Sequence, residues 1–279
     1  MMAEIVLTPP ESKKLIAKAI ASLKEVKQAL KSGYIVIKHG TTNAFVFKEI
    51  TGEEPKPPYV CGIVTPDATC VDELGSASRI NKGHSHYWVV EKGEILDNPN
   101  LEEIFGTLKK GDVFVSGANA LDLFGNAAIL IAAKNAGTFG KVYIQLTSSE
   151  VTHIIPASLE KVVFNPIQDI IKKLKLCEIK YAMGLPVRVL PLFGKVITEI
   201  EALRTIANVD VIQIAAGGVA GAYGAVVLGV MGDDREVEKI LKVVEEVKGT
   251  QDYPVKISNC NTCLFKNLTY CFERGRYKW

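Results

Sequence analysis

The chain has 279 residues, of which 48% are hydrophobic and 23% are charged, and its formal net charge is +2 at pH 7. This length is sufficient for one large or two ordinary domains, and the composition is that of an ordinary globular protein. Because charges of both signs are interspersed, nothing in the sequence indicates a nucleic-acid or polyanion partner.

The N-terminal sequence predicts a charged amphipathic helix rather than a targeting segment. Thr8 is suited to cap this helix, Pro9 to occupy its first position, and Glu11 to complete a capping box. Further along, residues 214–232 carry no charge and are long enough on paper to span a membrane. Their glycines favour two strands joined by a turn, so we expect no membrane span and a cytoplasmic protein.

A strand, a polar turn and a helix are predicted in succession between residues 34 and 50. A turn of this kind binds anions when its backbone N–H groups and the positive end of the helix point at the ligand. An ordinary turn with a Thr or Asn cap is the alternative. The candidate phosphate-binding residues of this turn are Gly40, Thr41, Thr42 and Asn43.

The polar segment 66–85 has little periodicity, and long loops of this kind inside compact domains are usually functional or mobile. Arg79 is suited to meet a phosphate or carboxylate, and His84 is a second candidate for ligand contact. A metal site formed by His84 and His86 is a less favoured alternative. A hairpin is predicted at residues 87–96.

Segment 112–126 is the predicted centre of the site. Residues 113–115 form the apolar run typical of a central strand that is covered on both faces. A helix is predicted next, at residues 127–134, and a strand at 141–146. The end of a strand before a helix lies at the carboxyl edge of a parallel sheet, where α/β proteins bind ligands. The small and polar residues expected at such strand ends are Gly117, Asn119, Asp122, Asn126 and Ser158.

The order of predicted elements indicates an α/β protein with two folded parts. Helices alternate with apolar strands in residues 1–184, which predicts a doubly wound, mostly parallel sheet. Residues 185–258 have the βαββαβ order of a small ferredoxin-like domain. Residues 259–279 form a cysteine-containing tail.

Three of the six cysteines cluster in this tail, as Cys260, Cys263 and Cys271. They are candidate ligands of zinc or an iron–sulfur cluster, with one further ligand such as Cys177. Buried thiols or one disulfide are the alternatives.

Several of these motifs resemble the superfamily of ribose-5-phosphate isomerases, glucosamine-6-phosphate deaminases, coenzyme A transferases and regulatory subunits of translation initiation factor 2B. The turn at residues 40–43 resembles the isomerases' phosphate loop, and residues 116–122 resemble their Gly-Ala-Asp strand end. Gly125-Asn126 and Gly137-Thr138 are similar to motifs of the factor 2B and methylthioribose-phosphate isomerase branch. The resemblance implies a Rossmann-like sheet and isomerase-like chemistry on a phosphorylated metabolite.

The sequence departs from this superfamily at the acidic residue of the strand-end motif. Asn119 occupies that position, and an amide cannot accept a proton as a general base does. Asp122 is therefore the candidate base. Lys134 stands roughly where the factor 2B branch has a lysine and is the candidate assisting group.

Two hypotheses about function are retained. The first is an isomerase-like enzyme acting on a sugar phosphate, a nucleotide or a coenzyme A-type compound. The second is a non-catalytic ligand sensor or regulatory protein with the same pocket, and a metal or iron–sulfur function of the tail is a further alternative. The second domain resembles bacterial microcompartment shell modules in residues 208–211 and 217–224, from which we expect a homo-oligomer.

Overall fold

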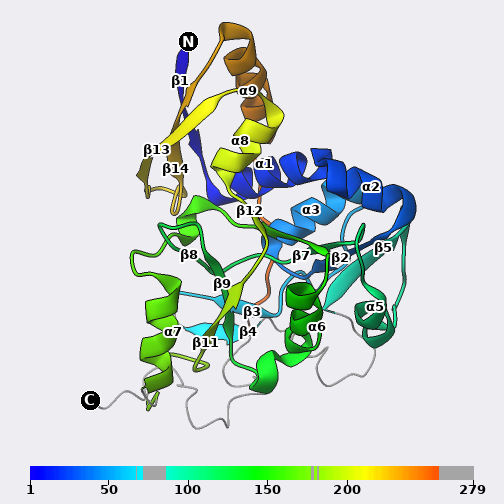
Figure 1. Cartoon of the computed structure of the whole chain (residues 1–279). Coiled ribbons are helices and arrows are strands. Elements are labelled where there is room, and N and C mark those ends of the chain that lie inside the picture. The colour runs from blue at the N-terminus through cyan, green and yellow to red at the C-terminus, as the bar shows by residue number, and fades with distance from the viewer. Residues whose placement is uncertain (67, 72–85, 177–178, 181, 258–279) are drawn as a thin grey trace.

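The computed structural model describes residues 1–66, 68–71, 86–176, 179–180 and 182–257. These residues form a mixed α/β structure (Figure 1). Its largest sheet is mixed and six-stranded, with the strand order β12-β10-β7-β2-β5-β6. The first four strands in that order run parallel, and β5 and β6 continue the sheet in antiparallel fashion. The strands are β2 (Tyr34–Lys38), β5 (Tyr87–Glu91), β6 (Glu94–Ile95), β7 (Val113–Val115), β10 (Thr152–Pro156) and β12 (Lys195–Ile197).

The central strand β7 is buried on both faces, as its continuous apolar sequence predicts. Val113 and Val115 pack on one side with α1 (Pro9–Ser22) and α3 (Thr41–Thr51). Phe114 packs on the other side with α5 (Leu101–Thr107) and α6 (Gly137–Ser148). Helices on both faces leave the ends of the parallel strands as the accessible edges of this sheet.

A second sheet joins the N-terminus to the C-terminal part of the chain. Its order is β1-β14-β13, with β1 (Met2–Leu7), β13 (Asp210–Ala216) and β14 (Val226–Met231). Helices α8 (Glu199–Ile206) and α9 (Asp234–Val247) pack against this sheet, and their buried apolar residues form one core with those of its strands (Figure 1). The run at residues 214–232 is therefore part of a hairpin, as predicted, and no helix in the described residues has the length and apolarity to cross a membrane.

The predicted ferredoxin-like order of residues 185–258 is corrected by the strand pairings. β11 (Arg188–Leu192) pairs with β9 (Ala127–Ile131), β12 joins the central sheet, and β14 pairs with the N-terminal β1. Residues 255–256 have no regular structure. A βαββαβ order of elements does not determine which strands pair, and these pairings cross the predicted boundary at residues 184 and 185 three times.

Two predicted elements have the opposite secondary structure. The run at residues 127–134, predicted as a helix, begins as strand β9, in a sheet of order β11-β9-β8 with β8 (Ala120–Leu121). A short apolar run does not distinguish a buried helix from a strand by periodicity. Residues 141–146, predicted as a strand, lie within α6, whose buried Phe139, Val142 and Leu146 have helical spacing.

The remaining elements differ from expectation in extent. The predicted N-terminal helix is divided at Leu23, which has extended backbone angles, into α1 and α2 (Lys24–Ser32). After β10, Leu159–Lys161 form a single 3₁₀ turn. The other elements are the hairpin of β3 (Gly62–Val64) and β4 (Thr69–Val71), the 3₁₀ turn η1 (Lys134–Ala136) and α7 (Ile167–Leu176).

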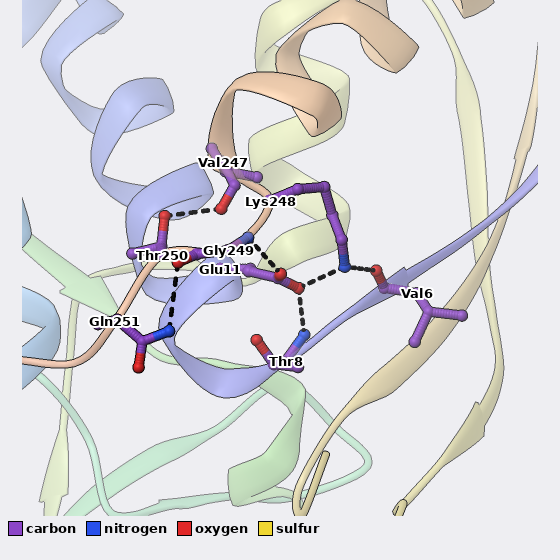
Figure 2. Close-up of polar contacts among 8 residues, drawn as sticks. All are labelled: Val6, Thr8, Glu11, Val247, Lys248, Gly249, Thr250 and Gln251. Atoms are coloured by element: carbon purple, nitrogen blue, oxygen red, sulfur yellow. Dashed lines mark hydrogen bonds and ion pairs between the residues drawn. The ribbon is translucent and has the colours of Figure 1, made fainter. Parts of the chain in front are cut away.

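Glu11 joins the start of α1 to the end of α9 (Figure 2). Its buried carboxylate accepts hydrogen bonds from the backbone N–H groups of Thr8, at 2.8 Å, and Gly249, at 2.9 Å. Lys248 Nζ donates a third, at 2.8 Å. Burial alone would raise the pKa of Glu11, but these hydrogen bonds hold it below its usual value. The predicted capping box is therefore confirmed and extended by a tertiary contact.

Substitution of Glu11 by glutamine is expected to lower the free energy of unfolding by about 2–3 kcal/mol, because backbone donors of Thr8 and Gly249 lose a charged acceptor. Lys248→Met is the matched control. Lys248 is about half exposed, so its loss should cost less than about 1 kcal/mol. Urea denaturation of both variants measures the difference, and equal losses would show that the ion pair rather than the backbone contacts stabilises this junction.

Candidate functional site

A cavity of about 390 Å³ lies at the carboxyl edge of β2 and β7. Lys38 ends β2, Asn119 follows β7, and His86 comes just before the antiparallel strand β5 at the same edge. The β3–β4 hairpin, β9 and the first turn of α6 complete the walls. Its volume lies within the range of small-molecule sites, roughly 300–1,000 Å³.

Lys38 extends from the sheet toward this cavity because of its position in β2. Side chains alternate along a strand, so Lys38 lies on the same face as Val36, which packs with Ile129 and Phe139. Both of the latter also line the cavity. In the described residues no carboxylate lines it and none forms an ion pair with Lys38.

Burial lowers the pKa of the Lys38 ammonium, and the nearby thiol of Cys61 partly offsets this effect. Apart from Lys38, the titratable side chains among the described lining residues are those of Cys61, Cys70, His86 and Tyr87. The apolar side chains of β9 and α6 surround them. Within the described part of the chain, the cavity is thus a largely apolar space that contains one amine and no carboxylate to stabilise its charge.

The N-terminus of α6 forms another wall, through residues 136–139. The first N–H groups of a helix have no partners within the helix, and the helix dipole makes this end positive. The preceding turn is unusual, because Asn135, Ala136 and Gly137 have φ values of 54°, 57° and 57°. Gly140 permits this turn, since a Cβ there would collide with the carbonyl oxygen of Asn135.

Gly140→Ala is expected to destabilise the protein by about 1–3 kcal/mol, because the turn before α6 must move away from the new methyl group. Gly106→Ala in α5 is the control, since no atom lies within 4 Å of a Cβ placed there. Removing a glycine from an open helix position should instead stabilise by about 0.5–1 kcal/mol. Thermal and urea denaturation of the two variants test these opposite signs, and stabilisation by both would contradict the close approach at Gly140.

The predicted turn at residues 40–43 lies at the correct edge but outside the cavity. Gly40 caps α3, and Asn43 is buried with its Nδ2 donating to Lys38 O at 2.6 Å. Asn43 also adjoins Gly117, where an ideal Cβ would lie 3.7 Å from Asn43 Oδ1. The predicted turn at residues 40–43 and the predicted strand end at Gly117 are therefore in contact. Of the predicted ligand-binding residues in the described part of the chain, however, Asn119 is the one that lines the cavity.

Asp122 lies away from the cavity and organises the turn between β8 and β9. Its carboxylate accepts from the backbone N–H groups of Phe124, Asn126 and Ile167 at 2.9–3.1 Å, and from Asn126 Nδ2. Burial would raise the pKa of Asp122, but these hydrogen bonds hold it below the usual value. The predicted general base and its neighbour Asn126 thus have a structural role in the folded chain.

Lys134 and Ser158 are also placed outside the cavity. Lys134 is exposed in the turn η1, directly after the lining residue Ala133. Ser158 is buried at the end of β10, where its hydroxyl donates to Glu199 Oε1 at 2.6 Å. Burial raises the pKa of Glu199, and its hydrogen bonds, including one from Leu159 N at 2.9 Å, oppose that shift. Ser158 thus connects the end of β10 to the first residue of α8 through a buried hydrogen bond.

Several predicted residues lie outside the described part of the chain: Arg79, His84, Cys177, Cys260, Cys263 and Cys271. Within the described residues, no group of three or more His, Cys, Asp or Glu side chains is arranged to hold a metal ion.

The sequence interpretation missed Lys38 and the N-terminus of α6. A signal existed for each. Lys38 lies two residues after the apolar Val36, and therefore on the same face of the strand, and it stands at the strand end. The spacing of Phe139, Val142 and Leu146 indicated a helix that begins near Gly137.

Two histidines are buried close to the same edge without lining the cavity. His39 packs against Trp88 on the opposite face of the sheet, at a ring separation of 4.1 Å, and burial lowers its pKa to about 3. His153 is hydrogen bonded to Ser116 Oγ and Phe193 O, both at 2.8 Å, and burial lowers its pKa to about 4. Because Ser116 is fully buried, this pair serves the packing of β7 against β10.

No protein-family model matches the chain, and no curated protein matches it in sequence. The class that the fold and the cavity define is a mixed α/β protein with a ligand-sized cavity at the carboxyl edge of its parallel strands.

Proposed function

We propose that this protein binds a small phosphorylated metabolite in the cavity at the carboxyl edge of β2 and β7. The observation that carries the proposal is the meeting of two positive elements in one apolar cavity. These are Lys38, which has no carboxylate partner among the described residues, and the N-terminus of α6. Phosphate binding at helix N-termini follows from the same N–H groups and dipole.

The charge balance of the walls supports an anionic ligand. In the described residues the cavity has a lysine, a helix N-terminus and no carboxylate, so the field inside favours negative charge. Asn119, exposed at the cavity, and the hydroxyl of Thr138 are suited to hydrogen bond to a sugar. A sugar phosphate is commensurate with about 390 Å³, whereas a coenzyme A-type compound would extend beyond it.

The resemblance to the isomerase and coenzyme A transferase superfamily agrees with ligand binding at this edge, but the phosphate position proposed here is α6 rather than residues 40–43. Isomerase-like proton transfer would need a base in the cavity. Neither the position that is acidic in the superfamily nor the candidate base Asp122 provides one there. The superfamily's acidic position is the amide Asn119, and Asp122 lies outside the cavity with its carboxylate hydrogen bonded to backbone N–H groups. This observation keeps a ligand-sensing role as the second candidate.

Lys38→Gln is expected to weaken binding of ribose 5-phosphate or its non-carbonyl analogue ribitol 5-phosphate by about tenfold or more, since a charged hydrogen bond contributes about 1.5–3 kcal/mol. Lys134→Gln, which removes an exposed lysine beside the cavity, should leave binding unchanged. Thermal shift with a panel of sugar phosphates and nucleotides, followed by calorimetry, measures both. The proposal is wrong if no phosphorylated compound stabilises the wild-type protein, because a saturating ligand must raise stability by mass action.

A further inference from the structure

We propose that the amine of Lys38 forms an imine with an aldehyde or ketone group of the metabolite bound in this cavity. This inference rests on the proposed function and narrows its ligand to carbonyl-bearing phosphorylated compounds. It assigns a covalent role to the residue that the sequence interpretation overlooked.

The surroundings of Lys38, which is partly exposed at the cavity, differ from those of the buried Lys13. Lys13 forms an ion pair with Asp252, so its charge is neutralised where it is buried. Lys38 instead lines an apolar cavity, and its main-chain carbonyl is the atom that Asn43 contacts. Its side chain has no hydrogen-bond partner in the described residues. A cation fixed only for structure would be expected to have the carboxylate that Lys13 has.

This environment makes the ammonium form of Lys38 easier to deprotonate, and the neutral amine is the nucleophile. A lysine in an apolar pocket is activated because desolvation penalises the ammonium ion, and the pKa of Lys38 is lowered for that reason. The residues of α6 that face the cavity can hold the phosphate. The ammonium form of Lys38 attracts the anionic ligand, and the amine reacts once it has lost its proton. Phosphate at α6 and a carbonyl group at Lys38 then define two ends of one ligand.

The reaction is balanced without any further reactant. The nitrogen lone pair attacks the carbonyl carbon and forms a C–N bond while the C=O π bond breaks, and a proton passes from the nitrogen to the oxygen to give a neutral carbinolamine. Loss of the hydroxyl group as water, with a proton from the nitrogen, leaves the imine. Hydrolysis reverses both steps, so no oxidant or reductant is consumed.

Reduction of the imine provides a direct test in the wild-type protein. The protein is incubated with dihydroxyacetone phosphate or ribose 5-phosphate and sodium cyanoborohydride at pH 7, and labelled peptides are mapped by mass spectrometry. We expect Lys38 to gain the mass of the probe less one oxygen atom. Labelling should be faster there than at exposed lysines such as Lys134 by about tenfold or more, because the cavity holds the carbonyl carbon of the bound probe beside the amine.

Two variants and an analogue separate this inference from the proposed function. Lys38→Arg keeps a cation but cannot form an imine, so it should lose trapping at this site while Lys134→Gln keeps it. Ribitol 5-phosphate has no carbonyl group and reports reversible binding alone. If this analogue binds and Lys38 is labelled no faster than surface lysines, the imine is wrong and the binding function stands. If neither the analogue nor either carbonyl probe binds, the proposed function itself is wrong.

Discussion

Asp122→Ala should lower the free energy of unfolding by about 3–5 kcal/mol, which is a large part of the 5–15 kcal/mol typical of a folded protein. The cause is the loss of one acceptor for three backbone donors, those of Phe124, Asn126 and Ile167. The Ile167 N–H group is buried, so its unmet hydrogen bond carries the desolvation cost of about 1–3 kcal/mol. The variant should therefore loosen both the β8–β9 turn and the start of α7.

Asp169→Ala is the matched control for this substitution. Asp169 lies in the first turn of α7 with its side chain more than half exposed, and it forms a surface ion pair with Lys172. Its replacement should change stability by less than about 1 kcal/mol. Denaturation in urea tests both variants. A stable Asp122→Ala protein that has lost only turnover would restore Asp122 to the role of general base.

Acidification from pH 7 to pH 4 should lower the free energy of unfolding by about 6 kcal/mol, through His39 and His153 together. The pKa values of these histidines fall to about 3 and about 4 in the folded protein, against an unperturbed value of 6.5. The unfolded chain therefore binds protons more readily, and stability is complete above pH 6.5 and is lost as the pH falls toward the folded values. Linkage gives about 3 kcal/mol for each residue at pH 4.

His39→Phe separates this effect from the titration of carboxylates. His39 packs on Trp88, and its Nδ1 has no hydrogen-bond partner among the residues that the structure describes, so an aromatic replacement suits the site. The variant should match wild-type stability at pH 7 within about 1 kcal/mol and exceed it by about 3 kcal/mol at pH 4. Proton NMR of the His39 and His153 rings should show no titration above pH 5. Ring signals that titrate near pH 6.5 would contradict the burial that causes the shifts.

The parts of the fold that could be predicted from the sequence depend on local or one-dimensional signals. The apolar run at residues 113–115 indicated a central strand, and the sequence at Thr8 and Glu11 indicated a capped helix. Strand pairing was less predictable because it depends on distant partners. The apolar residues 127–131 fit a buried helix equally well until β11 is known to lie beside them.

The edge that holds the site was predictable, but the residues that line it were not. The carboxyl ends of β2 and β7 do meet, as Asn43 and Gly117 show. Which side chains face open space depends on where β9 and α6 pack, and both were assigned to the wrong type of element. Asp122 illustrates the same difficulty, because a carboxylate in a polar turn has the same sequence signature whether it binds a ligand or its own backbone.

The pairing of β1 with β14 has a consequence for how the protein is made. Met1 donates to the carbonyl oxygen of Gly232, which is 231 positions further along the chain. At a translation rate of roughly 5–20 residues per second, the first strand leaves the ribosome about 10–50 s before its partner is synthesised. The side chains of Ile5 and Leu7, which are buried in the folded protein, lack their partner strand throughout that interval. Completion of this sheet is therefore a late event, and until then the apolar residues of β1 are exposed to aggregation or chaperone capture.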